Sequence, residues 1–366
     1  MSILYVINSP CWTDIAPKRL NNSKMFDHPL SENFTFFYYN LMKYGLVKKV
    51  IIYNNNKRRG GIDYNFVQSK LQTDYGVMEI KDHTERFNEI NADPLQNYVF
   101  CWTNIHECQN IKNKFIIIDN QYHGYNKKSD VNEKIHNFVL TESKNFKKYI
   151  NKNLPVLDYK LISYDHKIFM EKKYERKFKY DWILVSSFDK RKRHLKFLEI
   201  MSKSNLKNLK GCIVARDPNN KKKNIFDYFR TTPWSIYSKV LKYKKKLDFD
   251  IFINCHQKKK IELTYNSKIY INPSILDTGP RAQVEAMQLK TPVVTLSHIG
   301  ASDIVKNGTN GEIVNSIEEI PPAIKLILSN YQKYYNSELV EELLDEHFMP
   351  KLVKNIREER EKIKIV

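Results

Sequence analysis

The sequence predicts an α/β protein built from two successive domains, each with a largely parallel sheet. Short apolar runs rich in β-branched and aromatic residues alternate with longer amphipathic stretches, the pattern of strand–helix–strand units. This alternation occurs twice, on either side of a segment dense in charged residues. The chain has 366 residues, 42% of them hydrophobic, which suffices for the cores of two domains of ordinary size.

The first predicted domain spans residues 1–165. Its strands are short and bounded by Asn, Asp or Gly, and they comprise Ile3–Ile7, Val50–Tyr53, Tyr98–Trp102, Phe115–Ile118 and Phe138–Leu140. Amphipathic stretches predict helices at Asn33–Tyr44 and Glu142–Ile150.

Residues 166–180 are predicted to be a linker, because they are dense in Lys, Glu and Arg and show no strand pattern. The second domain, residues 181–336, has predicted strands at Trp182–Ser186, Gly211–Ala215, Ile251–Asn254, Ile269–Asn272 and Pro292–Leu296 and predicted helices at Leu195–Met201 and Arg281–Leu289. Residues 337–366 form a C-terminal segment whose part Ser337–Ile363 is amphipathic and helical in pattern. Open parallel sheets bind ligands beyond the carboxyl ends of their strands, so the chemistry is expected there.

The charge balance indicates anionic partners. Lys and Arg number 61 and Asp and Glu 41, a formal net charge of +20. Such a charge attracts nucleotide-sugars, nucleic acids or acidic membrane surfaces. A genome rich in A and T produces the same excess of lysine, so the charge alone does not select a partner.

Cysteine usage and hydropathy indicate the compartment. The five cysteines are scattered, with no Cys-x-x-Cys pair and no histidines at metal-binding spacing, which fits a reducing cytosol. The N-terminus has the pattern of a strand, not of a signal peptide, and no apolar run is long enough to span a bilayer. We therefore expect a cytoplasmic protein (the host cytoplasm if it is viral), free or peripheral to a membrane, and we leave its oligomeric state open.

The most informative stretch runs from Tyr270 to Met287. A strand ends at Pro273–Ser274, and Pro280 suits the first position of a following helix, whose free N–H groups attract a diphosphate. Asp277 precedes that helix and Glu285 lies in its second turn, so each carboxylate is placed to accept hydrogen bonds from vicinal hydroxyls. Taken singly, the two residues would be an N-cap and a solvated helical glutamate.

Two acidic residues with seven between them, at this strand–loop–helix junction, resemble the signature of retaining GT-B glycosyltransferases, most of all family 4 (group 1). Lys290–Thr295, Ile299–Val305 and Asn307–Gly311 follow that family's order and spacing, so the resemblance is strongest over Ser267–Val314. It implies two Rossmann-like domains with an interdomain cleft, in which the N-domain faces the acceptor and the C-domain binds the nucleotide-sugar. It also implies that residues 337–366 cross back to the N-domain.

The resemblance assigns roles to the matching residues. Glu285 would bind the ribose hydroxyls of the donor and Asp277 hydroxyls of the transferred sugar. The next loop and helix start would line the sugar and diphosphate through Gly279, Pro280 and Arg281. The family usually has Glu where this chain has Asp277, which leaves the donor sugar open.

A second phosphate-binding loop is expected after the first strand of the second domain, from Ser186 to His194. In the family, an Arg and a Lys there neutralise the diphosphate leaving group without a metal. Ser187–Phe188 replaces the usual Gly-Arg, so Ser187 is a predicted nucleotide contact. By spacing, Arg193 takes the Lys position, with Lys190 as the alternative; a solvated basic turn is the structural alternative.

Two histidines complete the predicted site. His123 lies in a polar loop after the strand Phe115–Ile118, where the family often has a histidine that contacts the sugar or the acceptor. His256 follows the strand Ile251–Asn254, near the expected pocket for the nucleotide base. Asp248-Phe249-Asp250 matches a short metal-binding motif of another glycosyltransferase fold, but we predict no metal and no cofactor besides the donor, expected to be a UDP-sugar.

The acceptor is left among several alternatives. Lys221–Lys246 and Asn54–Gly61 interleave basic with aromatic or polar residues, which suits nucleic acid, an anionic membrane face, or simply solvated helices. One hypothesis is a hexosyl- or pentosyltransferase acting on a cell-surface or lipid-linked glycan. Another is a virus-type enzyme that modifies hydroxymethylated bases in DNA. The third is a non-catalytic or epimerase-like GT-B protein that binds nucleotide-sugars. The resemblance implies retention of configuration, with the donor phosphate helping to deprotonate the acceptor.

Overall fold

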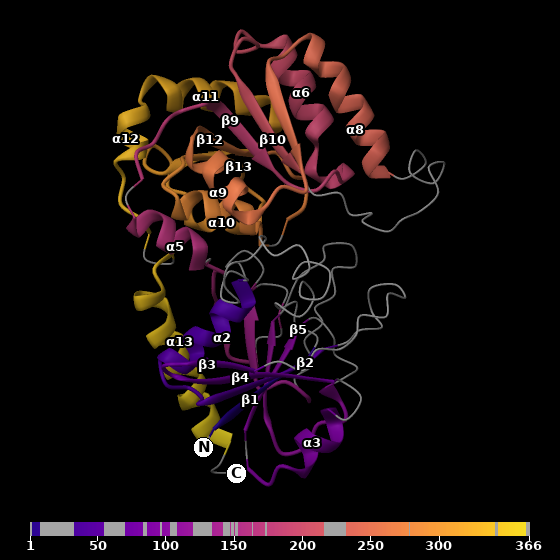
Figure 1. Ribbon diagram of the computed structural model, residues 1–366, viewed down its shortest axis with the longest axis vertical. Helices are drawn as coiled ribbons and strands as arrows, with labels where there is room; N and C mark the ends of the chain where they lie inside the picture. Colours follow the sequence, from indigo (N-terminus) through magenta and orange to yellow (C-terminus); the bar gives the residue numbers. More distant parts are fainter. Residues whose placement is uncertain are drawn as a thin grey trace. The chain divides into compact units, whose positions relative to one another are not determined.

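The chain divides into two compact units, one formed by residues 1–164 and 344–366 and the other by residues 165–343. Figure 1 shows the computed structural model along its whole length. It describes residues 2–7, 33–54, 70–82, 86–95, 97–102, 108–119, 134–141, 147, 150, 153–162, 164–172, 174–215, 232–277, 279–340 and 343–363.

The first unit is built on an eight-stranded sheet of order β3-β4-β2-β1-β5-β6-β7-β8. All neighbours pair in parallel except β3 and β4, which form an antiparallel edge. The strands are β1 (Ile3–Ile7), β2 (Lys49–Asn54), β3 (Lys70–Thr73), β4 (Gly76–Asp82), β5 (Tyr98–Trp102), β6 (Phe115–Asp119), β7 (Phe138–Thr141) and β8 (Val156–Asp158).

Helices cover both faces of this sheet. The side chains of β1 alternate: Leu4 and Val6 join the cluster beneath α2 (Asn33–Lys43), and Tyr5 and Ile7 join the opposite cluster with α3 (Arg86–Ala92).

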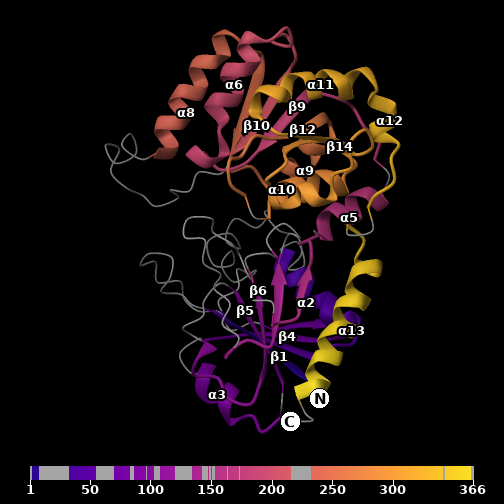
Figure 2. The same cartoon turned by 180° about the vertical axis from the view of Figure 1, so that it is seen from behind.

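The last helix, α13 (Asp345–Ile363), belongs to this first unit. Its apolar face, with Leu352 and Ile356 fully buried, completes the cluster beneath α2 (Figure 2). Lys43 Nζ lies 3.4 Å from Asp345 Oδ2, so an ion pair adds to this packing. The structure thus places the C-terminal helix on the first sheet.

The second unit has a six-stranded, fully parallel sheet of order β11-β10-β9-β12-β13-β14. Its strands are β9 (Tyr180–Val185), β10 (Gly211–Ala215), β11 (Phe249–Ile253), β12 (Ser267–Asn272), β13 (Val293–Leu296) and β14 (Gly311–Val314). The chain runs outward from β9 through β10 to β11 and then returns to lay β12 on the other side of β9. The switch point of the sheet, where parallel sheets bind ligands, therefore lies between β9 and β12.

Two helical layers sandwich this sheet. Trp182 and Leu184 of β9 pack into the cluster under α6, α8 and α11, and Ile183 packs into the cluster under α9 and α10. The helices are α5 (Tyr164–Glu171), α6 (His194–Lys203), α8 (Thr232–Lys242), α9 (Gln257–Tyr265), α10 (Arg281–Gln288), α11 (Ile320–Ser329) and α12 (Tyr331–Tyr335), with 3-10 turns η4 (Lys190–Lys192), η5 (Tyr243–Lys245), η6 (Gly300–Ile304) and η7 (Ile317–Glu319).

The predicted fold class, an α/β protein with two parallel-sheet bodies, is confirmed. The structure places residues 166–180, predicted to be a linker, in the second unit, where Phe169 of α5 packs on Tyr265 with ring centroids 4.9 Å apart. The helix predicted from Ser337 begins instead at Asp345. The predicted helix Glu142–Ile150 lies almost wholly outside the described residues.

Two further findings bear on the sequence predictions. Cys101 and Cys108 form a disulfide, which their spacing did not predict, whereas Cys212 and Cys255 are free. In the described part of the chain, no helix combines the length and apolarity needed to cross a membrane.

Candidate active site

A pocket of about 310 Å³ opens at the carboxyl ends of β9 and β12, at the switch point of the second sheet. Both strands and the loops that follow them contribute to it. The lining residues are Leu184, Val185, Ser186, Ser187, Lys192, Tyr270, Ile271, Asn272, Pro273, Ser274, Asp277, Gly279, Pro280, Arg281 and Ala282. Its position is the one that the parallel topology predicts for a ligand.

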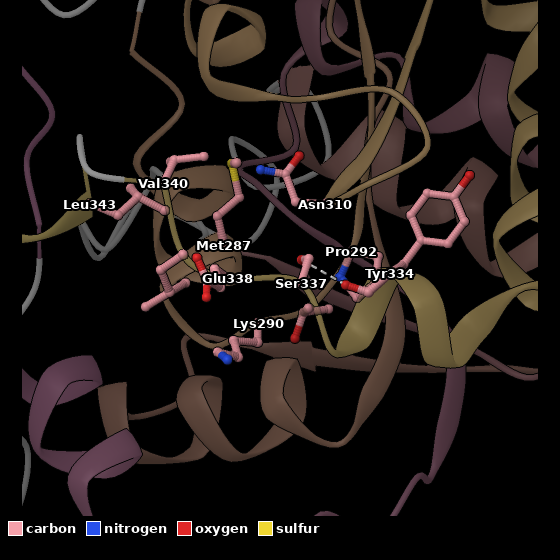
Figure 3. A pocket seen from close by; sticks show the side chains of 11 residues that line it. Met287, Lys290, Pro292, Asn310, Tyr334, Ser337, Glu338, Val340 and Leu343 are labelled. Carbon is pink, nitrogen blue, oxygen red and sulfur yellow. Dashed lines mark hydrogen bonds between the residues drawn. The ribbon is translucent and has the colours of Figure 1, made fainter.

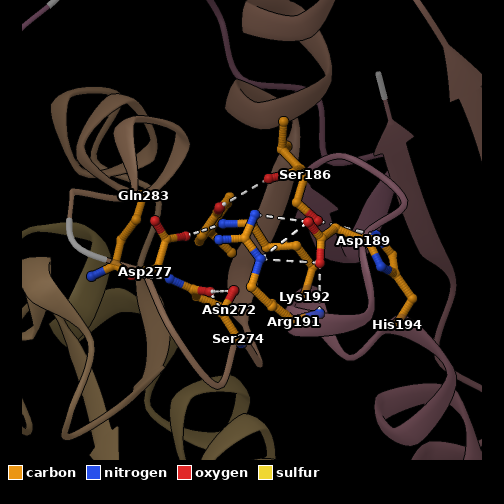
Figure 4. A network of polar contacts seen from close by, with 11 residues as sticks. Ser186, Asp189, Arg191, Lys192, His194, Asn272, Ser274, Asp277 and Gln283 are labelled. Carbon is orange, nitrogen blue, oxygen red and sulfur yellow. Dashed lines mark hydrogen bonds and ion pairs between the residues drawn. The ribbon is translucent and has the colours of Figure 1, made fainter. Parts of the chain in front are cut away.

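The loop after β9 is shaped by a cap and a left-handed residue. Asp189 caps η4, because its Oδ1 accepts from the Arg191 backbone N–H at 2.8 Å and its Oδ2 lies 2.7 Å from Arg191 Nη2. The guanidinium of Arg191 and this capping hold the pKa of Asp189 below its usual value. Arg193 then takes a left-handed conformation, with φ of 52°, at the junction with α6. Lys192, the residue before this turn, lines the pocket (Figure 4).

The loop after β12 is held by buried amide and hydroxyl groups. Asn272 Nδ2 donates to Gln283 Oε1 at 2.8 Å, and Ser274 Oγ donates to Asn272 Oδ1 at 2.7 Å. The carbonyl of Asp277 accepts from the Gly300 N–H at 2.9 Å, which fixes the loop just before α10 begins. The strand end and the helix start are therefore tied together on the two sides of Asp277.

The two loops are linked directly. The backbone N–H of Ile275 donates to the carbonyl of Arg191 at 2.8 Å. Lys192 Nζ and Asp277 Oδ2 form an ion pair between the same two loops, and both side chains are mostly buried (Figure 4). The pocket thus contains a matched cation and anion, one from each side of the switch point.

Glu285, one turn into α10, is a buried carboxylate with a cationic partner. Its Oε2 lies 2.6 Å from Lys260 Nζ of α9 and 3.9 Å from His166 Nε2 of α5. Burial opposes the charge on Glu285, but Lys260, with smaller contributions from His166 and Arg281, keeps the pKa of the carboxyl below its usual value. Burial lowers the pKa of His166 to about 4, so His166 is neutral near pH 7 and Lys260 supplies the positive charge.

A serine–histidine pair borders the pocket behind the first loop. Ser186 Oγ and His194 Nε2 lie 3.0 Å apart, and Phe188 packs against the imidazole with ring centroids 5.1 Å apart. Burial, reinforced by Lys192, lowers the pKa of His194 to about 3. The imidazole is therefore neutral at physiological pH.

The structure brings together many of the predicted site residues. Asp277, Ser187, Gly279, Pro280 and Arg281 all line the pocket. Glu285 follows one turn later on the same helix.

Other predicted residues lie elsewhere. Lys190 is exposed, and neither it nor Arg193 is among the pocket's lining residues. His256 is exposed at the N-cap of α9 and does not line the pocket either. His123 lies outside the described residues, as do residues 221–231 and 55–61 of the two basic stretches. The roles proposed for all these residues remain predictions.

Sequence reasoning missed several residues of this site. Lys192 stands between Arg191 and Arg193 in a run of four basic residues, and spacing alone does not show which one faces inward. Lys260 and His166 lie on two other helices, α9 and α5, and neither belongs to a sequence motif that would indicate a contact with Glu285. Ser186 and His194 lie in the predicted loop, but nothing in the sequence indicates that their side chains meet.

Two other features are separate from this pocket. Asp250 accepts a hydrogen bond from Tyr180 at 2.7 Å near the amino ends of β11 and β9. The pocket lies at the carboxyl ends of the strands, so this contact is at the other end of the sheet. Figure 3 shows a second hollow, lined by Met287, Val340 and Leu343 among others, whose volume of about 10 Å³ is room for about one water molecule. This hollow is too small for a substrate.

Comparison with known proteins agrees with this geometry. Residues 165–337, nearly all of the second unit, match the model of the family described as glycosyl transferases group 1. The sequence matches no curated protein.

Solved structures of GT-B glycosyltransferases share the fold of the whole chain. HepE from Anabaena, solved with UDP, is 11% identical over 100% of both chains, with a TM-score of 0.54. The UDP-forming trehalose-phosphate synthase from Burkholderia xenovorans is 10% identical over 98% of this chain and 100% of its own, with a TM-score of 0.61. Sucrose-phosphate synthase from Thermosynechococcus elongatus is 11% identical over 100% of this chain and 98% of its own, with a TM-score of 0.55. The prediction of a GT-B fold is confirmed, and together with the match to the group 1 family model it supports a glycosyltransferase.

Proposed function

We propose that the protein is a retaining glycosyltransferase that takes a sugar from a nucleotide-sugar donor, a UDP-sugar in the first instance. The observation that carries the proposal is the pocket at the switch point, which places Asp277, Lys192 and the start of α10 around one cavity, with Glu285 one turn beyond. Two proteins of the same fold support the choice of nucleotide, since one was solved with UDP and the other is described as UDP-forming.

The donor would lie along α10. Glu285 contacts Lys260 and His166 through Oε2, and among the described residues no hydrogen bond to Oε1 is seen, so Oε1 would accept from the ribose hydroxyls. The diphosphate would rest near the amino end of α10, where the positive end of the helix dipole and Arg281 favour an anion. Asp277 would accept from hydroxyls of the transferred sugar.

Charge stabilisation accounts for the chemistry. As the bond to the sugar breaks, negative charge grows on the diphosphate, and Lys192 and Arg281 would stabilise it in a pocket already organised around them. The departing phosphate would help to deprotonate the acceptor hydroxyl on the same face of the sugar, which gives retention. In this mechanism the two cations take the place of a metal ion.

The acceptor is proposed to be anionic. The surface of α8 and η5 displays five exposed lysines, Lys239, Lys242, Lys244, Lys245 and Lys246. The neighbouring aromatic residues Tyr237 and Tyr243 are partly buried against the core of the second unit, and Tyr237 packs on Phe188 with ring centroids 5.5 Å apart. These residues therefore offer charge contacts to phosphates, which suits DNA with hydroxymethylated bases and equally a lipid-linked glycan at an anionic membrane.

A donor screen tests the transferase proposal. The purified chain is incubated with UDP-, GDP-, ADP- and TDP-sugars, and nucleotide release is measured with and without EDTA. We expect release from at least one UDP-sugar, unaffected by EDTA, and an α-linked product from an α-linked donor by NMR. Glu285→Gln should abolish donor binding, whereas the exposed control Glu318→Gln should not. Wild-type turnover by Glu285→Gln would refute the site assignment.

A second screen tests the acceptor and the non-catalytic alternative. Hydroxymethylated DNA, unmodified DNA and anionic vesicles with a lipid-linked glycan are compared as acceptors at rising salt. Reversing Lys244, Lys245 and Lys246 to Glu should weaken use of the true acceptor more than reversing Lys351, Lys354 and Lys362 of α13, which changes the net charge equally. A protein that binds UDP but releases no nucleotide from any donor would favour a binding or epimerase-like role.

A further inference from the structure

The pair formed by Ser186 and His194 is not used by the mechanism above. Ser186 lies directly after β9 and lines the pocket, and its Oγ lies 3.0 Å from His194 Nε2. His194 is the first residue of α6 and is 1% exposed, so its imidazole is buried. The pair joins a buried ring to a hydroxyl at the edge of the pocket in which the diphosphate of the donor is proposed to bind.

The surroundings of the ring determine which atom carries the proton. His194 Nδ1 is buried and makes no hydrogen bond with any described residue. An N–H left without an acceptor is costlier than a lone pair left without a donor, so the neutral ring carries its proton on Nε2. Nε2 then donates to Ser186 Oγ, because that oxygen is its neighbour at 3.0 Å.

This tautomer leaves the serine proton directed elsewhere. Ser186 Oγ accepts from the histidine, so its own O–H must donate to another acceptor. Within the described part of the chain no acceptor for this proton is found, and the pocket is the open side of the residue. The anion that enters the pocket would supply the missing acceptor.

We propose that the Ser186 hydroxyl donates a hydrogen bond to a phosphate oxygen of the donor, and that His194 is the positioning residue that orients it. The assignment rests on the proposed function. A neutral donor is useful here because Lys192 is shared with Asp277, so part of its charge is already compensated. Ser186 thus contributes to diphosphate recognition in the loop where the related family has Gly-Arg.

Binding measurements with three probes test the assignment. Dissociation constants for UDP, pyrophosphate and uridine are measured by calorimetry for the wild type, Ser186→Ala and the control Ser202→Ala, whose hydroxyl donates within α6 to the Glu199 carbonyl. Ser186→Ala should weaken UDP and pyrophosphate about tenfold, the effect of losing one hydrogen bond to a charged group, and leave uridine unchanged. Ser202→Ala should match the wild type with all three probes.

Variants of the ring test the positioning role. His194→Gln retains an amide N–H near the position of Nε2 and should keep most of the affinity for UDP, whereas His194→Leu should weaken UDP and pyrophosphate as Ser186→Ala does, without changing uridine. Circular dichroism checks that both variants fold. If they do not, the comparison of Ser186→Ala with the wild type tests the proposal on its own.

The outcomes separate this inference from the proposed function. If Ser186→Ala binds UDP as the wild type does, or weakens UDP and uridine equally, the inference is wrong and the proposed function stands. If the wild type binds pyrophosphate but no nucleotide, the proposed function is wrong and the pyrophosphate comparison still decides the role of Ser186. If the wild type binds none of the probes, both are wrong.

Discussion

Lys192 and Asp277 form an ion pair that bridges the loops after β9 and β12, the two neighbouring strands at the switch point of the second sheet. Both residues line the same pocket, so a ligand there meets a cation and an anion that already neutralise each other. An anionic ligand must share Lys192 with Asp277. Because of this competition, substitutions of Lys192 and of Asp277 should change the affinity for an anionic ligand in different directions.

Replacing Lys192 by Met should weaken UDP binding ten- to a hundredfold, because a charged hydrogen-bond donor to phosphate is lost. Asp277→Asn should bind UDP as tightly as the wild type or more tightly, since Lys192 is released, yet it should turn over nucleotide-sugar more slowly. Calorimetry and nucleotide release measure the two effects, and Lys196→Met on the exposed face of α6 is the control. Weaker UDP binding in Asp277→Asn would contradict the competition. Parallel variants of Lys190 and Arg193 test the roles predicted for them.

The buried pair of Lys260 and Glu285 should matter for stability as well as binding. Lys260→Met leaves Glu285 without its charged partner, which raises the pKa of the carboxyl and costs about 3 kcal/mol of unfolding free energy. The double variant Lys260→Met/Glu285→Gln should recover much of that stability but not the affinity for UDP. Urea denaturation provides the measurement, with the exposed Lys258→Met as the control. If Lys260→Met were as stable as the wild type, the pair would contribute little to the unfolding free energy.

Two buried histidines predict a pH dependence of stability. His166 and His194 have pKa values lowered to about 4 and about 3, so below pH 6.5 the unfolded chain binds protons that the folded chain does not. Stability should therefore be greatest above pH 6.5 and fall toward pH 4, by up to about 1.4 kcal/mol per pH unit for each histidine. His194→Gln should reduce this slope, and the exposed His298→Gln should leave it unchanged. Urea unfolding between pH 4 and 8 tests both, and equal slopes for all variants would rule out the explanation.

Gly211 at the start of β10 is required by its neighbour Trp182 on β9. A Cβ added at Gly211 would lie 1.9 Å from Trp182 Cζ2, in a core with no room for the ring to move away. Gly211→Ala should therefore destabilise the protein by about 1–3 kcal/mol, and Trp182→Phe should offset part of that loss in the double variant. Additive losses in thermal unfolding would mean that the two positions do not interact.

Periodicity and composition predicted most of the fold. The strands Ile3–Ile7, Tyr98–Trp102 and Gly211–Ala215 occur with the predicted bounds, because each is a short apolar run buried in a parallel sheet. β3, with its exposed Lys70 and sequence Lys-Leu-Gln-Thr, was missed because an edge strand has no apolar run to reveal it. The helix expected from Ser337 was too long at its start, since charged and apolar residues alternate there without a cap that marks the boundary.

The active site was predicted only in part, because some of its contacts are local in the sequence and others are not. Asp277, Gly279 and Pro280 lie on one strand–loop–helix connection, so their proximity follows from local sequence. Lys260 reaches Glu285 from another helix across 25 residues, and the sequence shows nothing of that contact. In the basic loop, Lys192 is the residue that lines the pocket, and the chain then turns through a left-handed Arg193, a conformation that is not expected from an arginine.

Helix α13 makes the first unit discontinuous in the chain. During synthesis, residues 165–343 leave the ribosome before α13, which packs with α2 over the cluster that contains Leu4 and Val50, so this face of the first sheet stays partly uncovered until residues 345–363 have been made. We infer that the second unit can finish folding first. Removing α13, residues 345–363, would expose apolar side chains of the first unit that lie some three hundred residues earlier in the chain, such as Leu4 and Val50.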